Sequence, residues 1–329
     1  MNTFDYIQFK TVTDCINNPN FSKLSKNIDA EGRESFSLKT NERRKLIGYD
    51  NYDLKLVFNF DKEYATIGFS AKVLGNKYPD LINKNNIKDC LNLFSSKYGL
   101  CDSIDVEKAI TWGECNRLEV TKDIVLTLDT ADYQSLNNLV IDTHKWKTLT
   151  NNKGQVNKNG FGAMNTNNSE SIIIYGKGTE MADDKHEEFI RKNQLEDRFI
   201  DITRVEVKLN SSRAIRKRFD KTNDLNLVLN SERMPQIDIM SDIFSHIHRE
   251  DINEKIGDGL ILNQRDRERL SYAKEFKFNY KEMSADIRSR VGRNYNRELL
   301  HIRRVCGEKA LKIDSTIKTI KNINLLLSA

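Results

Sequence analysis

Two short segments that share one alternating pattern constrain the fold of this chain more than any other feature of its sequence. Residues 117–120 read Arg-Leu-Glu-Val, and residues 204–207 read Arg-Val-Glu-Val. Side chains two positions apart point to the same face of a β-strand, so each segment places an arginine and a glutamate on one face and two aliphatic side chains on the other. The pattern predicts two half-buried strands that carry Glu119 and Glu206 on their polar face.

A third segment adds a tyrosine and a lysine to these two carboxylates. Residues 171–180 read Ser-Ile-Ile-Ile-Tyr-Gly-Lys-Gly-Thr-Glu, so Tyr175 ends an apolar run and Lys177 follows two positions later. Two carboxylates can hold a hard divalent cation such as Mg²⁺ or Mn²⁺, which polarises a phosphate for attack. A tyrosine oxygen can attack phosphorus and become covalently linked, while a lysine contacts the phosphate, lowers the phenol pKa or protonates the leaving oxygen. We therefore hypothesise a phosphoryl-transfer site with Tyr175 and Lys177 as catalytic residues and Glu119 and Glu206 as metal ligands.

Each of these residues also has an ordinary structural explanation. A glutamate on the solvent face of a strand is usually hydrated, and an Arg-x-Glu strand often forms cross-strand ion pairs of little energetic value. A tyrosine at the end of a strand usually packs its ring and leaves its hydroxyl in water. The combination of Tyr175 and Lys177 with the two glutamates favours the site over these alternatives.

The composition predicts a soluble protein of a reducing compartment that is mildly attracted to polyanions. The 329 residues carry a net charge of +5. The five cysteines are odd in number and form no Cys-x-x-Cys pair, which argues against a disulfide framework or a structural zinc site. The first residues lack the layout of a signal peptide, and no apolar run approaches the roughly 20 residues of a membrane span. We expect a cytoplasmic location and no membrane partner.

Hydrophobic periodicity divides the chain into a sheet-forming part and a helical part. Strand and helix patterns alternate up to about residue 210, and the pattern is helical after residue 212. We expect an α+β fold, with a domain boundary near residue 220 that separates a domain of residues 1–220 from a mainly helical region of residues 221–329. The sequence predicts strands over residues 4–9, 52–60 and 63–69, the last two of which are expected to pair as a hairpin, and further strands within residues 108–128 and over residues 201–209. It predicts helices over residues 86–100, 133–143 and 180–200, and a loop or hairpin over residues 150–170.

Four blocks of sequence, in this order along the chain, resemble one known protein family. They are residues 70–75 (Ser-Ala-Lys-Val-Leu-Gly), 116–121 (Asn-Arg-Leu-Glu-Val-Thr), 174–180 (Ile-Tyr-Gly-Lys-Gly-Thr-Glu) and 204–209 (Arg-Val-Glu-Val-Lys-Leu). The blocks span roughly residues 50–220 and resemble the rolling-circle replication initiators of filamentous phages, the gene II type, and more distantly the Rep_trans plasmid initiators. This family looks like a variant of the HUH endonucleases.

The resemblance implies a fold, a reaction and roles for individual residues. It implies a central antiparallel sheet with flanking helices that carries a DNA-nicking site. In this site Tyr175 is the nucleophile, and Glu119 and Glu206 are ligands of Mg²⁺ or Mn²⁺. The reaction that the resemblance implies forms a 5′-phosphotyrosine and leaves a free 3′-OH that primes DNA synthesis.

The chain departs from the HUH pattern at the metal-binding strand. The His-hydrophobic-His sequence of those endonucleases is replaced by Arg-Leu-Glu at residues 117–119, and an arginine cannot serve as the second ligand. The rest of the metal shell is left open among Glu114, Glu180 and water. A His-Ile-His sequence does occur at residues 246–248, but the helical periodicity there puts positions two apart on different faces, so we interpret both histidines as surface residues.

A run of arginines in the C-terminal third predicts contacts with DNA phosphates. Several fall three to four positions apart between residues 281 and 304, so they can line one side of a helix, and arginine forks suit phosphate oxygens. The alternative is a solvated face on which they pair with acidic neighbours. We expect the amphipathic segment 311–327 either to dock on the protein or to form a dimer. The residues assigned to DNA contact are Lys72, Arg117, Arg204, Arg288, Arg290, Arg293 and Arg297.

These observations combine into one hypothesis about function. We expect a replication initiator that nicks one strand of single-stranded or origin DNA by metal-dependent tyrosine transesterification, for rolling-circle replication of a phage or plasmid. The alternatives are a relaxase or transposase of the same superfamily, a non-catalytic DNA-binding regulator, and a metal-dependent nuclease that uses water as its nucleophile. The sequence leaves open the origin sequence, the oligomeric state and the recruitment of a host helicase or polymerase.

Overall fold

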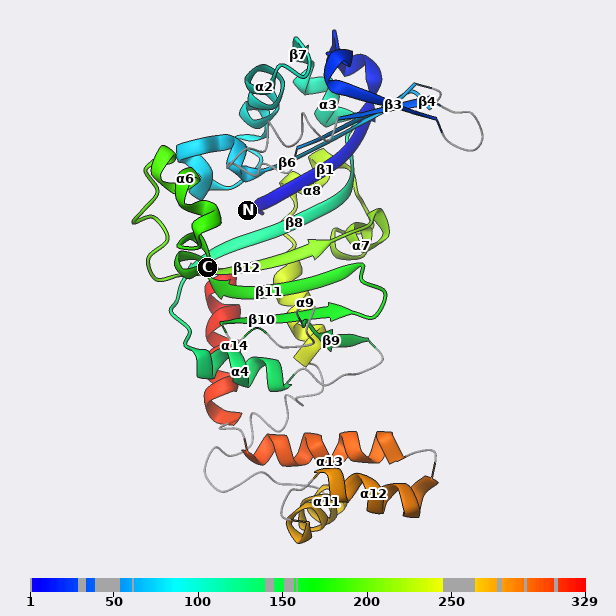
Figure 1. Cartoon of the computed structure of the whole chain (residues 1–329), viewed down its shortest axis with the longest axis vertical. Coiled ribbons are helices and arrows are strands. Elements are labelled where there is room, and N and C mark those ends of the chain that lie inside the picture. Colours follow the sequence, from blue (N-terminus) through cyan, green and yellow to red (C-terminus); the bar gives the residue numbers. More distant parts are fainter. Residues whose placement is uncertain are drawn as a thin grey trace.

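A ten-stranded sheet with the strand order β3-β4-β5-β6-β1-β8-β12-β11-β10-β9 forms the centre of the protein (Figure 1). Every pair of neighbouring strands in it is antiparallel. The structure is a computed structural model and describes residues 2–28, 34–38, 54–60, 62–139, 145–150, 157, 159–244, 264–276, 280–292, 295–310 and 313–329. The strands of the sheet are β1 (Phe4–Val12), β3 (Leu24–Ile28), β4 (Glu34–Leu38), β5 (Lys55–Asn59), β6 (Tyr64–Ser70), β8 (Glu114–Val125), β9 (Trp146–Thr148), β10 (Gly160–Asn165), β11 (Glu170–Gly176) and β12 (Ile202–Leu209).

Each of the predicted strands is present, but the segment of residues 108–128 begins with the end of a helix. β1, β6 and β12 confirm the strands predicted for their segments, and β5 pairs with β6 as the predicted hairpin. Within residues 108–128 the strand β8 begins only at Glu114, because helix α3 (Val106–Thr111) comes first. The side chain of Asp105 stabilises that helix by accepting a hydrogen bond from the backbone N–H of Lys108.

The Gly- and Asn-rich segment 150–170 forms a hairpin in the part that the structure describes. β10 pairs with β11 over Gly160↔Tyr175 to Met164↔Ser171, and β10 also pairs with β9. Residues 151–156 lie outside the described residues. The hairpin brings Tyr175 to the end of a strand that is paired on both sides.

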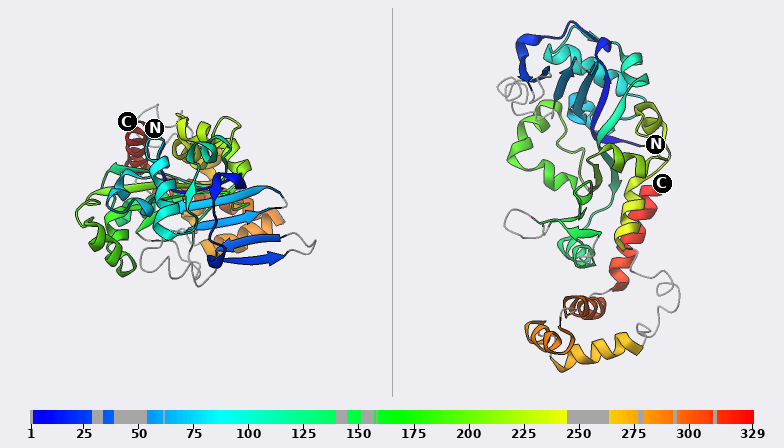
Figure 2. Two further views of the ribbon diagram at one scale, coloured as in Figure 1. Left: turned by 90° about the horizontal axis from the view of Figure 1, so that it is seen from above. Right: turned by 90° about the vertical axis from the view of Figure 1, so that its right-hand side faces the viewer.

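One face of the sheet is aliphatic and is covered by helices. Leu118, Val120, Val205 and Val207 are fully buried in the main hydrophobic core, as the alternation in their two segments predicts. Each such side chain stabilises the fold by about 2 kcal/mol relative to exposure. Helices α7, α9 and α14 contact strands β8, β11 and β12, and Figure 2 shows α9 and α14 side by side against the sheet. These helices are α7 (Ser212–Arg218), α9 (Pro235–Phe244) and α14 (Ile313–Ser328).

The opposite face of the sheet carries polar side chains and is covered near β11 and β12 by three short elements. Tyr78 of η3 packs edge-on against Phe189 and Phe199, with ring centroids 5.5 and 5.8 Å away. Helix α5 contacts both β11 and β12. Arg204 and Glu206 on this part of the sheet are therefore shielded from water. The covering elements are η3 (Ala71–Asp80), α5 (Lys177–Met181) and α6 (Asp184–Asn193).

The hydrophobic core does not end at residue 220, where the sequence predicts a domain boundary. Leu225, Val228 and Ile239 belong to the same core as the sheet, and so does Ile323 of the last helix. The second core lies in α11 (Gln264–Glu275), α12 (Tyr280–Val291) and α13 (Tyr295–Ala310), where it contains Ala273, Met283, Ile287 and Ile302. The boundary at 220 does not match these cores, because the helices after it cover the aliphatic face of the sheet.

The remaining described elements are short and lie around the sheet. None of the helices in the described part of the chain combines the length and apolar character that crossing a bilayer requires. The predicted helices near residues 86–100 and 133–143 are present as α2 and α4, and α14 docks on β8, α4 and α9. These elements are η1 (Thr13–Cys15), β2 (Ile16–Asn17), η2 (Phe21–Lys23), α2 (Ile87–Tyr98), β7 (Ser103–Ile104), α4 (Thr130–Leu139) and α8 (Leu225–Asn230).

Candidate active site

Three carboxylates from three neighbouring strands meet on the polar face of the sheet. Asp5 of β1, Glu119 of β8 and Glu206 of β12 each place an oxygen within 4.8 Å of the others. Glu119 and Glu206 share a face because Glu206 lies opposite Thr121, two positions along β8. Asp5 joins them because the register of β1 against β8 shifts between Phe4 and Tyr6. The two glutamates predicted from the sequence are therefore brought together, and Asp5 is a third member that the sequence pattern does not indicate.

The cluster has the chemistry of a divalent-cation site. Burial raises the pKa of Glu119, and the neighbouring charge of Glu206 raises it further, whereas Lys208 and Arg117 act in the opposite direction. Asp5 Oδ1 is buried and accepts no hydrogen bond from any described residue. All three groups are hard oxygen donors of the kind that Mg²⁺ and Mn²⁺ prefer. The residues present thus fit the cation that the family resemblance implies.

Tyr175 points at this cluster. Its hydroxyl donates a hydrogen bond to Glu206 Oε2 at 3.2 Å, across strands β11 and β12. The register explains the contact, because Tyr175 lies opposite Arg204, and Glu206 is the next residue on the same face of β12. Burial raises the pKa of Tyr175 well above its ordinary value, and the charge of Glu206 adds to the effect. The phenol is therefore protonated at neutral pH, and a carboxylate oxygen stands in position to accept its proton.

Lys177 lies next to Tyr175 but directs its ammonium to another group. Its Nζ donates to Glu180 Oε2 at 2.7 Å and lies 5.8 Å from the centroid of the Tyr175 ring. The side chain is only 3% exposed, and burial lowers the pKa of Lys177, with Arg204 contributing in the same direction. These contacts therefore place this lysine behind the nucleophile, in a buried network.

The buried network continues to Lys72, which the sequence assigns to DNA contact. Glu180 Oε1 pairs with His186 Nε2 at 2.6 Å, and His186 Nδ1 lies 3.3 Å from Lys72 Nζ. Burial by itself would raise the pKa of Glu180, but its contacts with His186 and Lys177 outweigh burial and lower the pKa. Glu180 is thus committed to this network. Lys72 is buried, so it joins η3 to α6 instead of presenting its charge at the surface.

Arg204 is fully buried, which corrects its assignment to DNA contact. Its Nε and Nη2 donate to the two carboxylate oxygens of Asp123 at 2.6 and 2.8 Å, and Nη1 donates to the Tyr78 hydroxyl at 2.8 Å. Nη1 also lies 3.5 Å from Asp5 Oδ1. A guanidinium enclosed in this way cannot reach a phosphate. Arg204 instead orients Asp5 from behind the cluster.

Two other basic side chains lie on the solvent side of the carboxylates. Arg117 Nη2 pairs with Glu119 Oε1 at 2.8 Å, and its guanidinium carbon lies 4.7 Å from the centroid of the Tyr6 ring. Lys208 Nζ lies 2.9 Å from Glu206 Oε1 and 3.3 Å from Glu119 Oε1. Arg117 is a predicted site residue, whereas Lys208 is not. The alternation of Arg204, Glu206 and Lys208 along β12 is the sequence signal that could have identified it.

The predicted C-terminal arginines have mixed surroundings. Arg288 and Arg297 are exposed, and Arg288 lies over the ring of Tyr295, 5.4 Å from its centroid. Arg290 pairs with Asp286 at 2.9 Å, as the solvated-face alternative predicts. Arg293 lies outside the described residues, and so do the two histidines of residues 246–248.

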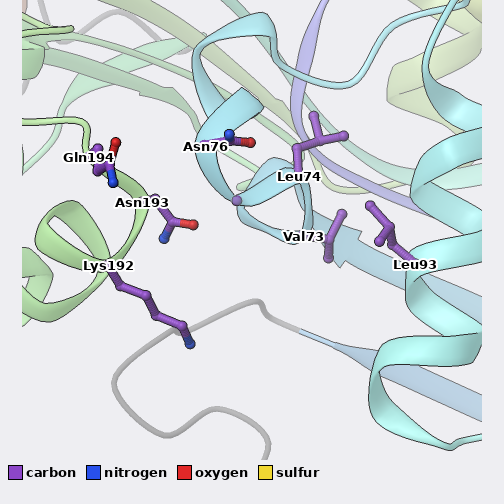
Figure 3. A pocket seen from close by; sticks show the side chains of 8 residues that line it. Val73, Leu74, Asn76, Leu93, Lys192, Asn193 and Gln194 are labelled. Atoms are coloured by element: carbon purple, nitrogen blue, oxygen red, sulfur yellow. The ribbon is translucent and has the colours of Figure 1, made fainter.

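A separate pocket lies between η3, α2 and α6 (Figure 3). Its volume is about 390 Å³, and its walls combine the aliphatic side chains of Val73 and Leu93 with the side chains of Asn76 and Lys192. None of the predicted catalytic or metal-binding residues lines it. The candidate chemistry is therefore on the sheet and not in this pocket.

Compared with known proteins, the chain matches no protein-family model and no curated protein sequence. The carboxylate cluster and the four sequence blocks that carry the family resemblance are therefore the features of this chain that bear on its function.

Proposed function

We propose that this protein cuts one strand of DNA by metal-dependent transesterification, with Tyr175 as the nucleophile. The observation that carries the proposal is the hydrogen bond of 3.2 Å between the Tyr175 hydroxyl and Glu206, inside a cluster of three carboxylates. An isolated tyrosine or an isolated acidic pair would be ordinary on a sheet. A tyrosine aimed at a buried acidic cluster has a nucleophile and a proton acceptor in one place.

In the reaction that these residues support, one P–O bond forms, one P–O bond breaks, and each proton has an acceptor. Oη of Tyr175 attacks the phosphorus of the DNA, and its proton passes to Glu206 Oε2. The new P–Oη bond replaces the P–O3′ bond, and the departing 3′-oxygen takes up a proton from water to become a 3′-OH. A divalent cation held by Asp5, Glu119 and Glu206 would neutralise the phosphate oxygens and orient them for in-line attack. The energy of the broken bond stays in the phosphotyrosine, so a 3′-OH can later rejoin the strand.

The distribution of charge supports DNA as the substrate. Residues 264–310, which contain α11, α12 and α13, hold thirteen Lys and Arg against seven Asp and Glu, a net charge of +6 in a chain whose total is +5. The remainder of the chain is therefore close to neutral. Concentrated positive charge in a protein that also carries a candidate phosphoryl-transfer site favours a polyanionic substrate. The resemblance to rolling-circle initiators makes initiation of replication at an origin, with the 3′-OH as primer, the biological role that we propose.

The test is the formation of a covalent protein–DNA adduct. A library of end-labelled single-stranded oligonucleotides is incubated with the protein and Mn²⁺ and separated under denaturing conditions. We expect a labelled band at the mass of the protein in the wild type, its loss in Tyr175→Phe, and its retention in Tyr64→Phe, a matched control on β6 whose ring lies under Lys10.

Other outcomes distinguish the alternatives. Cleavage without an adduct would indicate a nuclease that uses water, and DNA binding that needs neither Mn²⁺ nor Tyr175 would indicate a regulator. An adduct that transfers its strand to the second end of a mobile element would indicate a relaxase or transposase. The proposal fails if no adduct forms on any sequence of the library.

A further inference from the structure

Lys208 occupies the space between two of the three clustered carboxylates. It lies directly opposite Glu119 in the pairing of β12 with β8, and Glu206 precedes it by two residues on the same face. Its Nζ is 2.9 Å from Glu206 Oε1 and 3.3 Å from Glu119 Oε1. One ammonium therefore contacts both glutamates and offsets part of their mutual repulsion, which a divalent cation at the same oxygens would do more fully.

The lysine also lies on the route by which a phosphate would arrive from solvent. The side chains of Glu119 and Glu206 are 10% and 6% exposed, whereas that of Lys208 is 30% exposed. By contrast, Lys177, the lysine indicated by the sequence, is 3% exposed and pairs with Glu180. Of these two lysines, only Lys208 stands between the acidic cluster and the surface.

We propose that Lys208 is a displaceable cation, which holds Glu119 and Glu206 together before metal binding and contacts the scissile phosphate afterwards. This inference rests on the proposed function. Oε1 of each glutamate faces the ammonium, and a divalent cation at the same oxygens would repel it at short range. The flexible stem of a lysine lets its charge move without movement of the strand. Once the cation has displaced it, the Lys208 ammonium has its nearest negatively charged partner in the phosphate oxygens on the solvent side of the cation.

Metal binding by the full-length protein tests the first half of the inference. Mn²⁺ is titrated calorimetrically into the wild type, Lys208→Met and Lys10→Met, the last of which removes an exposed lysine of β1 that contacts the ring of Tyr64. We expect Lys208→Met to bind Mn²⁺ about tenfold more tightly than the wild type, because the competing charge is gone, and Lys10→Met to bind as the wild type does. Lys208→Gln, which keeps a polar side chain, provides a second neutral variant in case Lys208→Met does not fold.

Nicking at saturating Mn²⁺ tests the second half. We expect the rate of adduct formation by either neutral variant to fall about a hundredfold, although both hold metal more tightly, because the charge that would meet the phosphate is missing. Lys208→Arg should keep the weaker metal affinity of the wild type and recover part of the rate.

The result distinguishes failure of this inference from failure of the proposed function. Equal Mn²⁺ affinities in the wild type and in the neutral variants, together with loss of binding in Glu206→Gln, would overturn the role of Lys208 and leave the metal site intact. Mn²⁺ binding that is unchanged in Glu206→Gln, or absent from the wild type and from the neutral variants, would overturn both. Tighter binding in the neutral variants with an unchanged nicking rate would overturn the contact with phosphate.

Discussion

The Tyr175 hydroxyl donates a hydrogen bond to Glu206 Oε2, while Oε1 of the same carboxylate faces the ammonium of Lys208. Glu206 thus connects the candidate nucleophile to the acidic cluster through one planar group. Two basic residues of β12 flank Glu206 on the same face of the strand. Arg204 lies on the buried side of the cluster, and Lys208 lies on its solvent side. A single strand therefore supplies the proton acceptor and two of the surrounding positive charges.

Replacement of either glutamate by glutamine should abolish metal-dependent nicking and preserve DNA binding. Glu119→Gln and Glu206→Gln keep the shape of the side chain but remove a charged oxygen ligand, so we expect adduct formation to fall at least about a hundredfold. Quantitative gels measure nicking, and fluorescence anisotropy measures affinity for a single-stranded oligonucleotide. Nicking at the wild-type rate in both variants would remove these residues from the metal site.

Asp5 should behave as a third ligand, although the sequence pattern does not indicate it. Its Oδ1 lies 3.5 Å from Arg204 Nη1, a contact that the amide oxygen of asparagine can keep, so Asp5→Asn should leave the sheet intact. We expect a Mn²⁺ dissociation constant about tenfold or more above that of the wild type, since one of three charged ligands is lost. Calorimetric titration measures the change. An affinity equal to that of the wild type would restrict the site to the two glutamates.

Arg204 and Arg117 should have opposite effects, despite their equivalent places in the two matching segments. Arg204→Met removes the partner of Asp123 from a fully buried position, so we expect a loss of about 3–5 kcal/mol in the free energy of unfolding. Arg117→Met removes a half-exposed ion pair, for which we expect about 1 kcal/mol or less together with weaker DNA binding. Denaturant unfolding and DNA titration measure the two effects. A stable Arg204→Met with reduced DNA affinity would show that the guanidinium reaches DNA after all.

Glu170 should make the attachment of α7 and α9 to the sheet sensitive to acid. It accepts hydrogen bonds from Arg218 Nε at 2.9 Å and Lys217 Nζ at 2.8 Å, and Arg218 Nη2 also donates to Asp242 of α9 at 2.6 Å. Burial would raise the pKa of Glu170, but these partners outweigh burial and lower the pKa below its ordinary 4.5.

The sign of the acid effect follows from this lowered pKa. A carboxyl group whose pKa is lower in the folded state stabilises the protein fully above its unfolded pKa and loses that contribution as the pH falls through the folded pKa. We expect Glu170→Gln to cost about 3 kcal/mol at neutral pH, since it leaves the buried Arg218 with only the half-exposed Asp242 as a charged partner. The variant should also lose less stability than the wild type between about pH 5 and pH 3. Urea titrations at both pH values measure the free energy of unfolding. An equal loss in the wild type and in Glu170→Gln would contradict this role.

The exposed arginines of α12 and α13 should contribute to DNA affinity through salt-dependent contacts. If Arg288 and Arg297 each neutralise one phosphate, the double alanine variant should reduce the slope of log K against log salt concentration by about two units. Fluorescence anisotropy over a range of NaCl concentrations measures this slope. Arg233→Ala is the control, because Arg233 pairs with Asp220 at 2.7 Å outside these helices. An unchanged slope in the double variant would assign both arginines to a solvated face.

Local periodicity is sufficient to predict β1, β5, β6, β8 and β12 and the residues that share a face on β8 and β12, but it does not indicate β3, β4 or β9. The period of two along β8 and β12 is a property of each segment alone, so Glu119 and Glu206 could be placed on a polar face and Leu118 and Val205 on the aliphatic one. The same reasoning could not place the boundary of the core, because a helix pattern does not reveal which surface the helix covers. For this reason periodicity alone predicts a separate helical region after residue 220, although Leu225 and Ile239 complete the core of the sheet.

The amino-acid sequence by itself determined which side chains alternate on each strand, and it indicated Tyr175 and the two glutamates as one group. Only the tertiary structure decided that β8 and β12 are neighbours, that a register shift in β1 adds Asp5, and that Lys208 lies between the glutamates. It also decided that Arg204 is buried while Arg117 reaches solvent. The physical reason is that register and depth of burial arise from pairing and packing between segments about eighty residues apart, which the local alternation of each segment does not encode.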